Sequence, residues 1–133
     1  MGAWGTGLFD NDDAADFCND LDDLAAADRP EAIRAALAEA AGESGYLDLS
    51  IGSVAVAAAA IVAAQRPGGS PLDESYGPED PISHLSEDFA PLAAQALTRV
   101  LADDSELREC WGEAESMAEW VDQLEQLRTV LAN

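Results

Sequence analysis

The sequence predicts an all-α fold, a single domain of about five to six helices around a buried alanine-rich helix, with a long Pro/Gly-rich loop. Three observations predict it. Apolar residues recur at the helical spacing i, i+3, i+4 and i+7 through most of the chain, and no segment alternates polar and apolar residues convincingly. The charge-free stretch VAVAAAAIVAA lies in the middle. A chain of 133 residues is long enough for one hydrophobic core and too short for two.

The first helix is expected over residues 11–27, with Asp10 as its N-cap. Aspartates occupy the opposite, outer face, and those in the first turn lie where the positive end of the helix dipole favours anions. The positions expected to face the core are Ala14, Phe17, Cys18, Leu21, Leu24 and Ala25.

A second helix is expected to start at residues 28–31, where Asp28 and Glu31 have the spacing of a capping box and Pro30 falls in the first turn. Gly42 is expected to end it. The core-facing positions of this helix are Ile33, Ala36, Leu37 and Ala40.

The most apolar segment covers residues 49–64 and is predicted to be a helix buried on nearly all sides. It is shorter than the roughly 20 apolar residues that a membrane span needs. Ala55, Ala59 and Ala63 form a stripe of small residues along which neighbouring helices can approach closely. The following segment, 66–85, carries four of the six prolines and is predicted to be a long loop.

Helical spacing returns over residues 86–102, through Phe89, Leu92, Ala93, Ala96, Leu97, Val100 and Leu101. A short helix is expected over 105–112. The last helix is expected to begin near Ser116, which has capping-box spacing to Glu119, and its inward positions are Trp120, Val121, Leu124, Leu127 and Leu131. Trp111 and Trp120 are predicted to be structural residues.

The N-terminal stretch GAWGTGLFDNDDAADF combines three glycines with two aromatic residues. It does not match the G-x-G-x-x-G pattern of phosphate-binding loops, and the aspartates that follow would repel a phosphate. Glycines permit turns with positive φ, so the aromatic side chains can fold back onto the core beside the first helix. The residues assigned this structural role are Trp4, Gly5, Gly7, Phe9 and Asp10.

This opening stretch resembles the start of the DUF4259 family, small bacterial proteins of unknown function whose signature is similar to W-G-x-G-x-F-x-N-D-D-A-x-D-F. The stretch DDSELRECW at 103–111 resembles a second recurring block of that family. The two blocks lie near both ends, so the resemblance implies that the family covers the whole chain. It implies no activity, cofactor or catalytic residue.

The composition is strongly acidic, with 27 Asp and Glu against six arginines and no lysine, for a formal net charge of -21. Such a field repels nucleic acid and anionic membranes and attracts basic proteins and cations. No secretory signal is recognisable, and a cytoplasmic location is expected. Cys18 and Cys110 lack metal or redox spacing and are expected in the core, although a disulfide between them stays open.

No catalytic arrangement is recognisable, and the protein is predicted not to be an enzyme and to need no cofactor. The single histidine, His84, lies in the Pro-rich loop without a partner motif. Asp10, Asp12, Asp13 and Asp16 concentrate hard oxygen ligands, but an EF-hand beginning at Asp10 would need glycine and glutamate where Ala15 and Leu21 stand. No metal site is predicted, and a divalent-cation-binding protein stays an alternative.

The favoured function is a non-enzymatic binding module for a basic protein partner, similar to an immunity protein or inhibitor. The alternative is a generic soluble protein whose acidity reflects the proteome or adaptation to salt. The sequence does not indicate an oligomeric state. The candidate partner-binding residues form one patch on the first helix, Asp12, Asp16, Asp20 and Asp23, and a second near the C-terminus, Glu109, Glu113 and Glu119.

Overall fold

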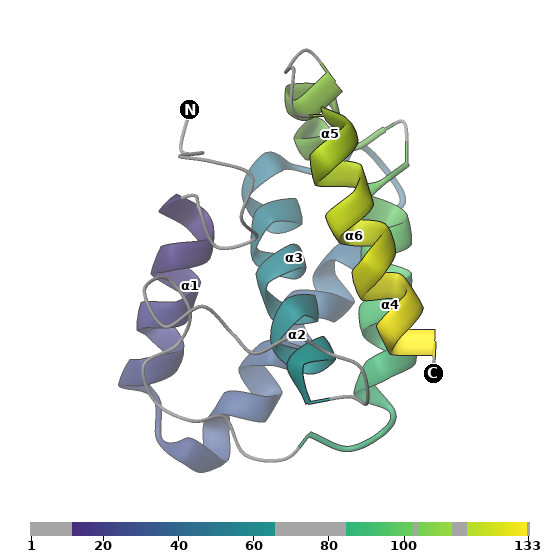
Figure 1. The fold of residues 1–133 in the computed structure, drawn as a ribbon. Coiled ribbons are helices and arrows are strands. Elements are labelled where there is room, and N and C mark those ends of the chain that lie inside the picture. Colours follow the sequence, from purple (N-terminus) through teal and green to yellow (C-terminus); the bar gives the residue numbers. More distant parts are fainter. Residues whose placement is uncertain (1–11, 66–84, 103, 113–116, 133) are drawn as a thin grey trace.

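The computed structural model describes residues 12–65, 85–102, 104–112 and 117–132 (Figure 1). This part of the chain contains six α-helices, one short 3₁₀ helix and no β-strand, which confirms the predicted all-α fold. The elements are α1 (Asp12–Asp23), η1 (Ala26–Asp28), α2 (Arg29–Ala41), α3 (Leu49–Ala64), α4 (Phe89–Val100), α5 (Glu106–Gly112) and α6 (Met117–Ala132).

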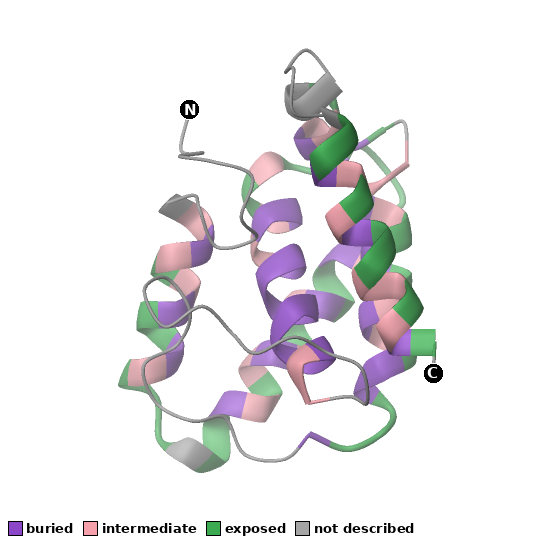
Figure 2. Ribbon diagram, in the orientation of Figure 1, coloured by how far each residue is buried: buried purple, intermediate pink, exposed green. Residues whose placement is uncertain are grey.

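Helix α3 is the centre of the fold, as the alanine-rich segment predicts. It packs against α1, α2, α4, α5 and α6, and Figure 2 shows it as the most continuously buried helix. Ala55, Ala59 and Ala63 are at most 1% exposed, so the small-residue stripe faces neighbouring helices. The Asp48 carboxylate caps α3 by accepting a hydrogen bond from the Ser50 N–H. Among the described helices, none is both long and apolar enough to cross a membrane.

Helix α1 is shorter than the expected 11–27, because it ends at Asp23 and the chain enters η1 three residues later. Leu24 and Ala25, expected in the core, are exposed, and this part of the prediction was wrong. The physical reason is the neighbouring guanidinium of Arg29, whose Nε donates to the Leu21 carbonyl at 2.7 Å. That bond supplies a donor to a carbonyl at the helix end, which would otherwise need an N–H group from a further turn of helix.

Helix α2 has Pro30 in its first turn and ends with Gly42 as its C-cap, as predicted. The expected capping box is wrong, because the Asp28 side chain makes no capping hydrogen bond. Asp28 has φ -92° and ψ -15°, a helical conformation inherited from η1, whereas a capping side chain needs extended backbone. The predicted core positions Ile33, Leu37 and Ala40 are buried.

Helix α4 covers less than the expected 86–102, because residues 86–88 form a turn rather than helix. Phe89 N–H and Ala90 N–H donate to the carbonyls of Ser86 and Glu87, both at 3.2 Å. The C-cap is Leu101. Helices α5 and α6 lie where the sequence predicts them, and Trp120 is 3% exposed in the core. The predicted loop falls almost wholly on residues 66–84, outside the described residues.

Candidate functional site

The first candidate patch is the outer face of α1. Asp16, Asp20 and Asp23 are exposed, whereas Ala14, Cys18 and Leu21 on the inner face are buried against α3. The three carboxylates follow one another at spacings of four and three residues, which places them along one side of the helix. Asp12 lies in the first turn of α1, but its side chain lies outside the described residues. The structure therefore presents at least three of the four predicted α1 contacts to solvent.

The second candidate patch is divided between two helices. Glu109 on α5 and Glu119 on α6 are both exposed, and Glu113 lies outside the described residues. In Figure 1, α1 and α6 lie on opposite sides of α3. The structure thus does not bring the two predicted patches together.

Three of the described arginines bind backbone carbonyls, and two of them do so at helix ends. Five of the six lie in the described part of the chain, and three of these donate to backbone carbonyls: Arg29 to Leu21 and Asp22, Arg99 to Glu43 and Gly45, and Arg108 to Leu101. The carbonyls of Leu21 and Leu101 belong to the last turns of α1 and α4, where the helix dipole also favours a cation.

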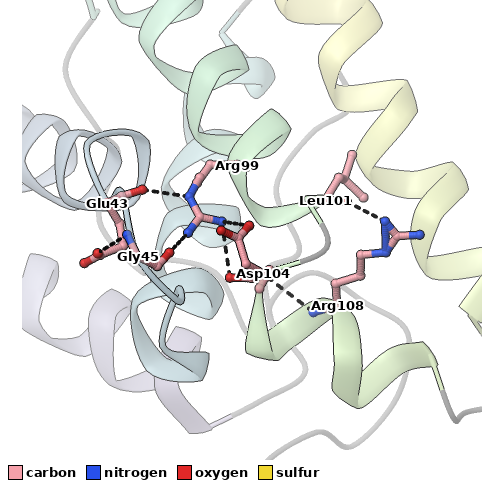
Figure 3. A network of polar contacts seen from close by, with 7 residues as sticks. Glu43, Gly45, Arg99, Leu101, Asp104 and Arg108 are labelled. Atoms are coloured by element: carbon pink, nitrogen blue, oxygen red, sulfur yellow. Dashed lines mark hydrogen bonds and ion pairs between the residues drawn. The ribbon is translucent and has the colours of Figure 1, made fainter.

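Arg99 joins three segments that are far apart in the sequence (Figure 3). Its Nε donates to the Glu43 carbonyl at 2.8 Å and one terminal nitrogen donates to the Gly45 carbonyl. The other terminal nitrogen lies 3.0 Å from the Asp104 carboxylate. The Arg99 side chain is 13% exposed, so its charge is largely withdrawn from the surface.

The segment that follows Gly45 is fixed to α5 by backbone bonds. Leu47 N–H donates to the Asp104 carbonyl at 2.8 Å, and Glu106 N–H donates back to the Leu47 carbonyl at 2.9 Å, which makes an isolated parallel bridge between Leu47 and Ser105. The Glu106 carboxylate accepts from the Leu49 N–H at 2.9 Å. An acidic side chain at this helix start also meets the positive end of the α3 dipole.

Tyr46 lies within this fixed segment and points outward. It is 52% exposed, and its hydroxyl donates to the Glu109 carboxylate at 2.9 Å. Glu109 is therefore one of the predicted contacts and also holds an exposed aromatic ring.

A separate charged contact connects α2 to the start of α4. Arg34 lies 2.8 Å from the Asp88 carboxylate and its guanidinium stacks 4.4 Å above the centre of the Phe89 ring. Hydrogen bonds from the Ser86 hydroxyl and then from Arg34 lower the pKa of Asp88. The Asp88 side chain is 59% exposed, and this contact joins α2 to the start of α4.

Cys18 has the chemistry of a core residue. It is a free thiol, 2% exposed, and burial first, then the charge of Asp22, raises its pKa to about 12. A thiol in this state is a poor nucleophile near neutral pH. The side chain of Cys110 lies outside the described residues, and no group of three metal-ligating side chains occurs within the described part.

Several predicted structural residues fall where nothing is described. Trp4, Gly5, Gly7, Phe9 and Asp10 all precede residue 12, and the side chain of Trp111 is also outside the described residues. Their assigned roles stay predictions.

Sequence reasoning missed the carbonyl-binding arginines, the Glu106 cap and the Tyr46–Glu109 bond. One signal was available for Arg29: it immediately precedes a proline in a helix's first turn, next to the end of the preceding helix. Arg99 and Glu106 act on segments more than 50 residues away, and local periodicity contains no information about such pairs.

The fold and the exposed carboxylates define an acidic all-α protein. The sequence profile of one family, described as a domain of unknown function (DUF4259), matches residues 2–123. The chain therefore belongs to the DUF4259 family, as its N-terminal stretch predicts. No curated protein and no solved structure gives a significant match to the chain.

Proposed function

We propose that this protein is a non-enzymatic binding module for a basic protein partner, in the manner of an immunity protein or inhibitor. The observation that supports this best is the separation of charges: Asp16, Asp20 and Asp23 are exposed along one side of α1, while Arg29 and Arg99 are directed to backbone carbonyls. Within the described residues, no ion pair involves those three aspartates.

A surface of this kind acts mainly on association. The formal charge of -21 gives a long-range negative field that steers a basic partner and falls with ionic strength. Complementary charges can raise association rates from about 10⁵–10⁶ to 10⁸–10⁹ M⁻¹s⁻¹ at low salt. The same field disfavours nucleic acid, whose phosphates are anionic. The free Cys18 fits a reducing compartment, and the proposal includes a cytoplasmic location.

The test is a pull-down from the native host at low salt with the tagged protein and two charge-matched variants. One variant carries Asp16→Asn and Asp20→Asn on α1; the control carries Glu39→Gln and Glu87→Gln at exposed positions outside the candidate patches. Each removes two negative charges, and exposed substitutions usually change stability by less than about 0.5 kcal/mol. We expect a basic protein to be enriched by the parent and the control, and to be lost with the α1 variant and with added salt.

Two results would count against the proposal. If no basic protein is enriched, the acid face has no partner in that host. If both variants weaken the capture equally, only net charge matters, and the surface is a solvated acidic coat rather than a binding site.

A further inference from the structure

Helix α1 is joined to the described part of the fold less extensively than the other long helices. It packs chiefly against α3, whereas α2, α4 and α6 each pack against α3 and against a second helix as well. Figure 1 shows α1 at one edge of the molecule. Its buried side chains are Ala14, Cys18 and Leu21, with Phe17 partly buried, so little apolar area fixes α1 on α3. The other four helices can keep their mutual contacts when α1 leaves α3.

The charges of α1 work against its own helix. Six of its 12 residues are aspartates and none is an arginine. Aspartates three or four positions apart repel one another, and Asp20, Asp22 and Asp23 lie in the last turn, where the negative end of the helix dipole disfavours anions. Residues 49–64, which form α3, contain no charged side chain that would compensate. An isolated helix of about 12 residues is marginal in water, so we expect α1 to unfold once it leaves α3.

Arg29 supplies the cation that the end of α1 lacks. It is the first residue of α2 and is 7% exposed. Its Nε donates to the Leu21 carbonyl at 2.7 Å, and a terminal nitrogen donates to the Asp22 carbonyl at 3.2 Å. Both carbonyls belong to the last turn of α1, so these bonds exist only while that turn is folded beside the start of α2. Arg29 therefore connects the end of α1 to the rest of the molecule.

We propose that α1 opens as a separate unit, with Arg29 as the contact that holds it closed and the repulsion among its aspartates as the force that favours opening. Each carboxylate contributes little by itself, but the six act together. Screening or neutralising them shifts the equilibrium toward the closed form, which makes α1 a charge-controlled conformational switch. The inference does not depend on the proposed function, since dissolved salt is sufficient as the effector. A basic partner of the closed α1 face would act in the same direction, by mass action.

Native-state hydrogen exchange of the full-length protein, followed by NMR at low urea concentrations, tests this. We expect the amides of α1 to open together and at least about 10-fold more often than those of α3 and α4, with little dependence on urea because little surface is exposed. Raising NaCl from 0.01 to 1 M shortens the Debye length from about 30 Å to about 3 Å. This should reduce the opening of α1 by about 3- to 10-fold.

Arg29→Ala removes the contact that holds α1 closed. It should increase the opening of α1 by about 10- to 100-fold, the effect of losing a hydrogen bond from a charged group to a buried carbonyl. Arg29→Lys keeps the charge and should lie between the parent and Arg29→Ala. Arg34→Ala is the matched control, because it removes the same charge from α2 but its ion pair with Asp88 joins α2 to the start of α4. It should change the opening of α1 by less than about threefold.

Three results would overturn the inference. If the amides of α1 exchange with the same free energy of opening as those of α3 and α4, α1 unfolds only with the whole protein. If Arg29→Ala affects α1 no more than Arg34→Ala does, Arg29 does not hold it closed. If NaCl leaves the opening of α1 unchanged, charge does not control it. The proposed function would stand in each case, because the α1 face keeps its charge and the pull-down tests its partner separately.

Discussion

Replacing Arg99 with alanine tests whether its guanidinium holds the segment 43–47 on α4 and α5. The Nε bond to the Glu43 carbonyl is partly buried, and a hydrogen bond from a charged group contributes about 1.5 to 3 kcal/mol. The bond to Gly45 is exposed and is worth about 1 kcal/mol. The Asp104 carboxylate is 60% exposed, so its ion pair adds no more than about 0.5 kcal/mol.

Together these contacts predict a loss of about 3 kcal/mol in the free energy of unfolding. For a domain of this size, each kcal/mol corresponds to roughly 3 to 4 °C in Tm, so Tm should fall by about 10 °C. Arg99→Lys should recover only part of the loss, because an ammonium group lacks the planar fork that reaches separate acceptors. Urea unfolding followed by circular dichroism measures both variants.

The control is Arg128→Ala. Arg128 makes an exposed i,i+3 ion pair with Glu125 at 2.6 Å, and such pairs contribute about 0.3 to 0.5 kcal/mol. Both alanine variants make the net charge more negative by one, so general repulsion is the same in both. If Arg99→Ala destabilises the protein no more than Arg128→Ala does, the carbonyl contacts contribute nothing and the reasoning fails.

Three further predictions follow from charge and packing. Tm should rise with NaCl between 0.1 and 1 M, because the Debye length falls from about 10 Å to about 3 Å and the repulsion between the carboxylates weakens. A Tm that does not change with NaCl would contradict this. Micromolar calcium should raise Tm no more than NaCl of equal ionic strength, and stoichiometric calorimetric binding lost with Asp12→Asn would show otherwise. In a Cys110→Ser background, Cys18 should resist thiol reagents in the folded state, and fast labelling at neutral pH would refute the burial of Cys18. The free energy of unfolding should also fall as pH rises above 9.0 toward 12, because the Cys18 thiol deprotonates at lower pH in the unfolded chain than in the folded one.

The elements that local patterns determine are the ones that sequence predicts. The central helix is apolar on all sides and free of charge, so its bounds of Leu49–Ala64 agree with the prediction at both ends. Pro30 and Gly42 mark the start and end of α2 because one fixes φ and lacks an N–H and the other is suited to a helix end. Core positions such as Ile33 and Leu97 follow from the same helical spacing.

The errors lie where a side-chain contact, rather than hydrophobic periodicity, decides the local structure. The pattern of α1 continues through Leu24 and Ala25, but Arg29 binds the carbonyls of Leu21 and Asp22 and the helix ends there. In the candidate site, too, some features follow from local sequence and others depend on contacts between distant residues. Exposure of Asp16 and Asp20 follows from helical periodicity, whereas the contact between Tyr46 and Glu109 joins residues 63 positions apart and exists only in the folded chain.

The use of arginine explains how a chain with so few cations can have both ordered helix ends and a strongly acidic surface. Arg99 reaches acceptors in two separate segments, which a lysine with one compact charge would not bridge in the same geometry. A guanidinium that binds a backbone carbonyl is not available to neutralise a carboxylate on an acidic face. The contacts that stabilise the fold therefore leave the negative potential at those faces stronger. The proposed partner binding would therefore depend on other residues than stability does. Substituting exposed aspartates on α1 should change association and leave unfolding almost unaffected, whereas substituting Arg99 should change unfolding while the α1 face keeps its charge.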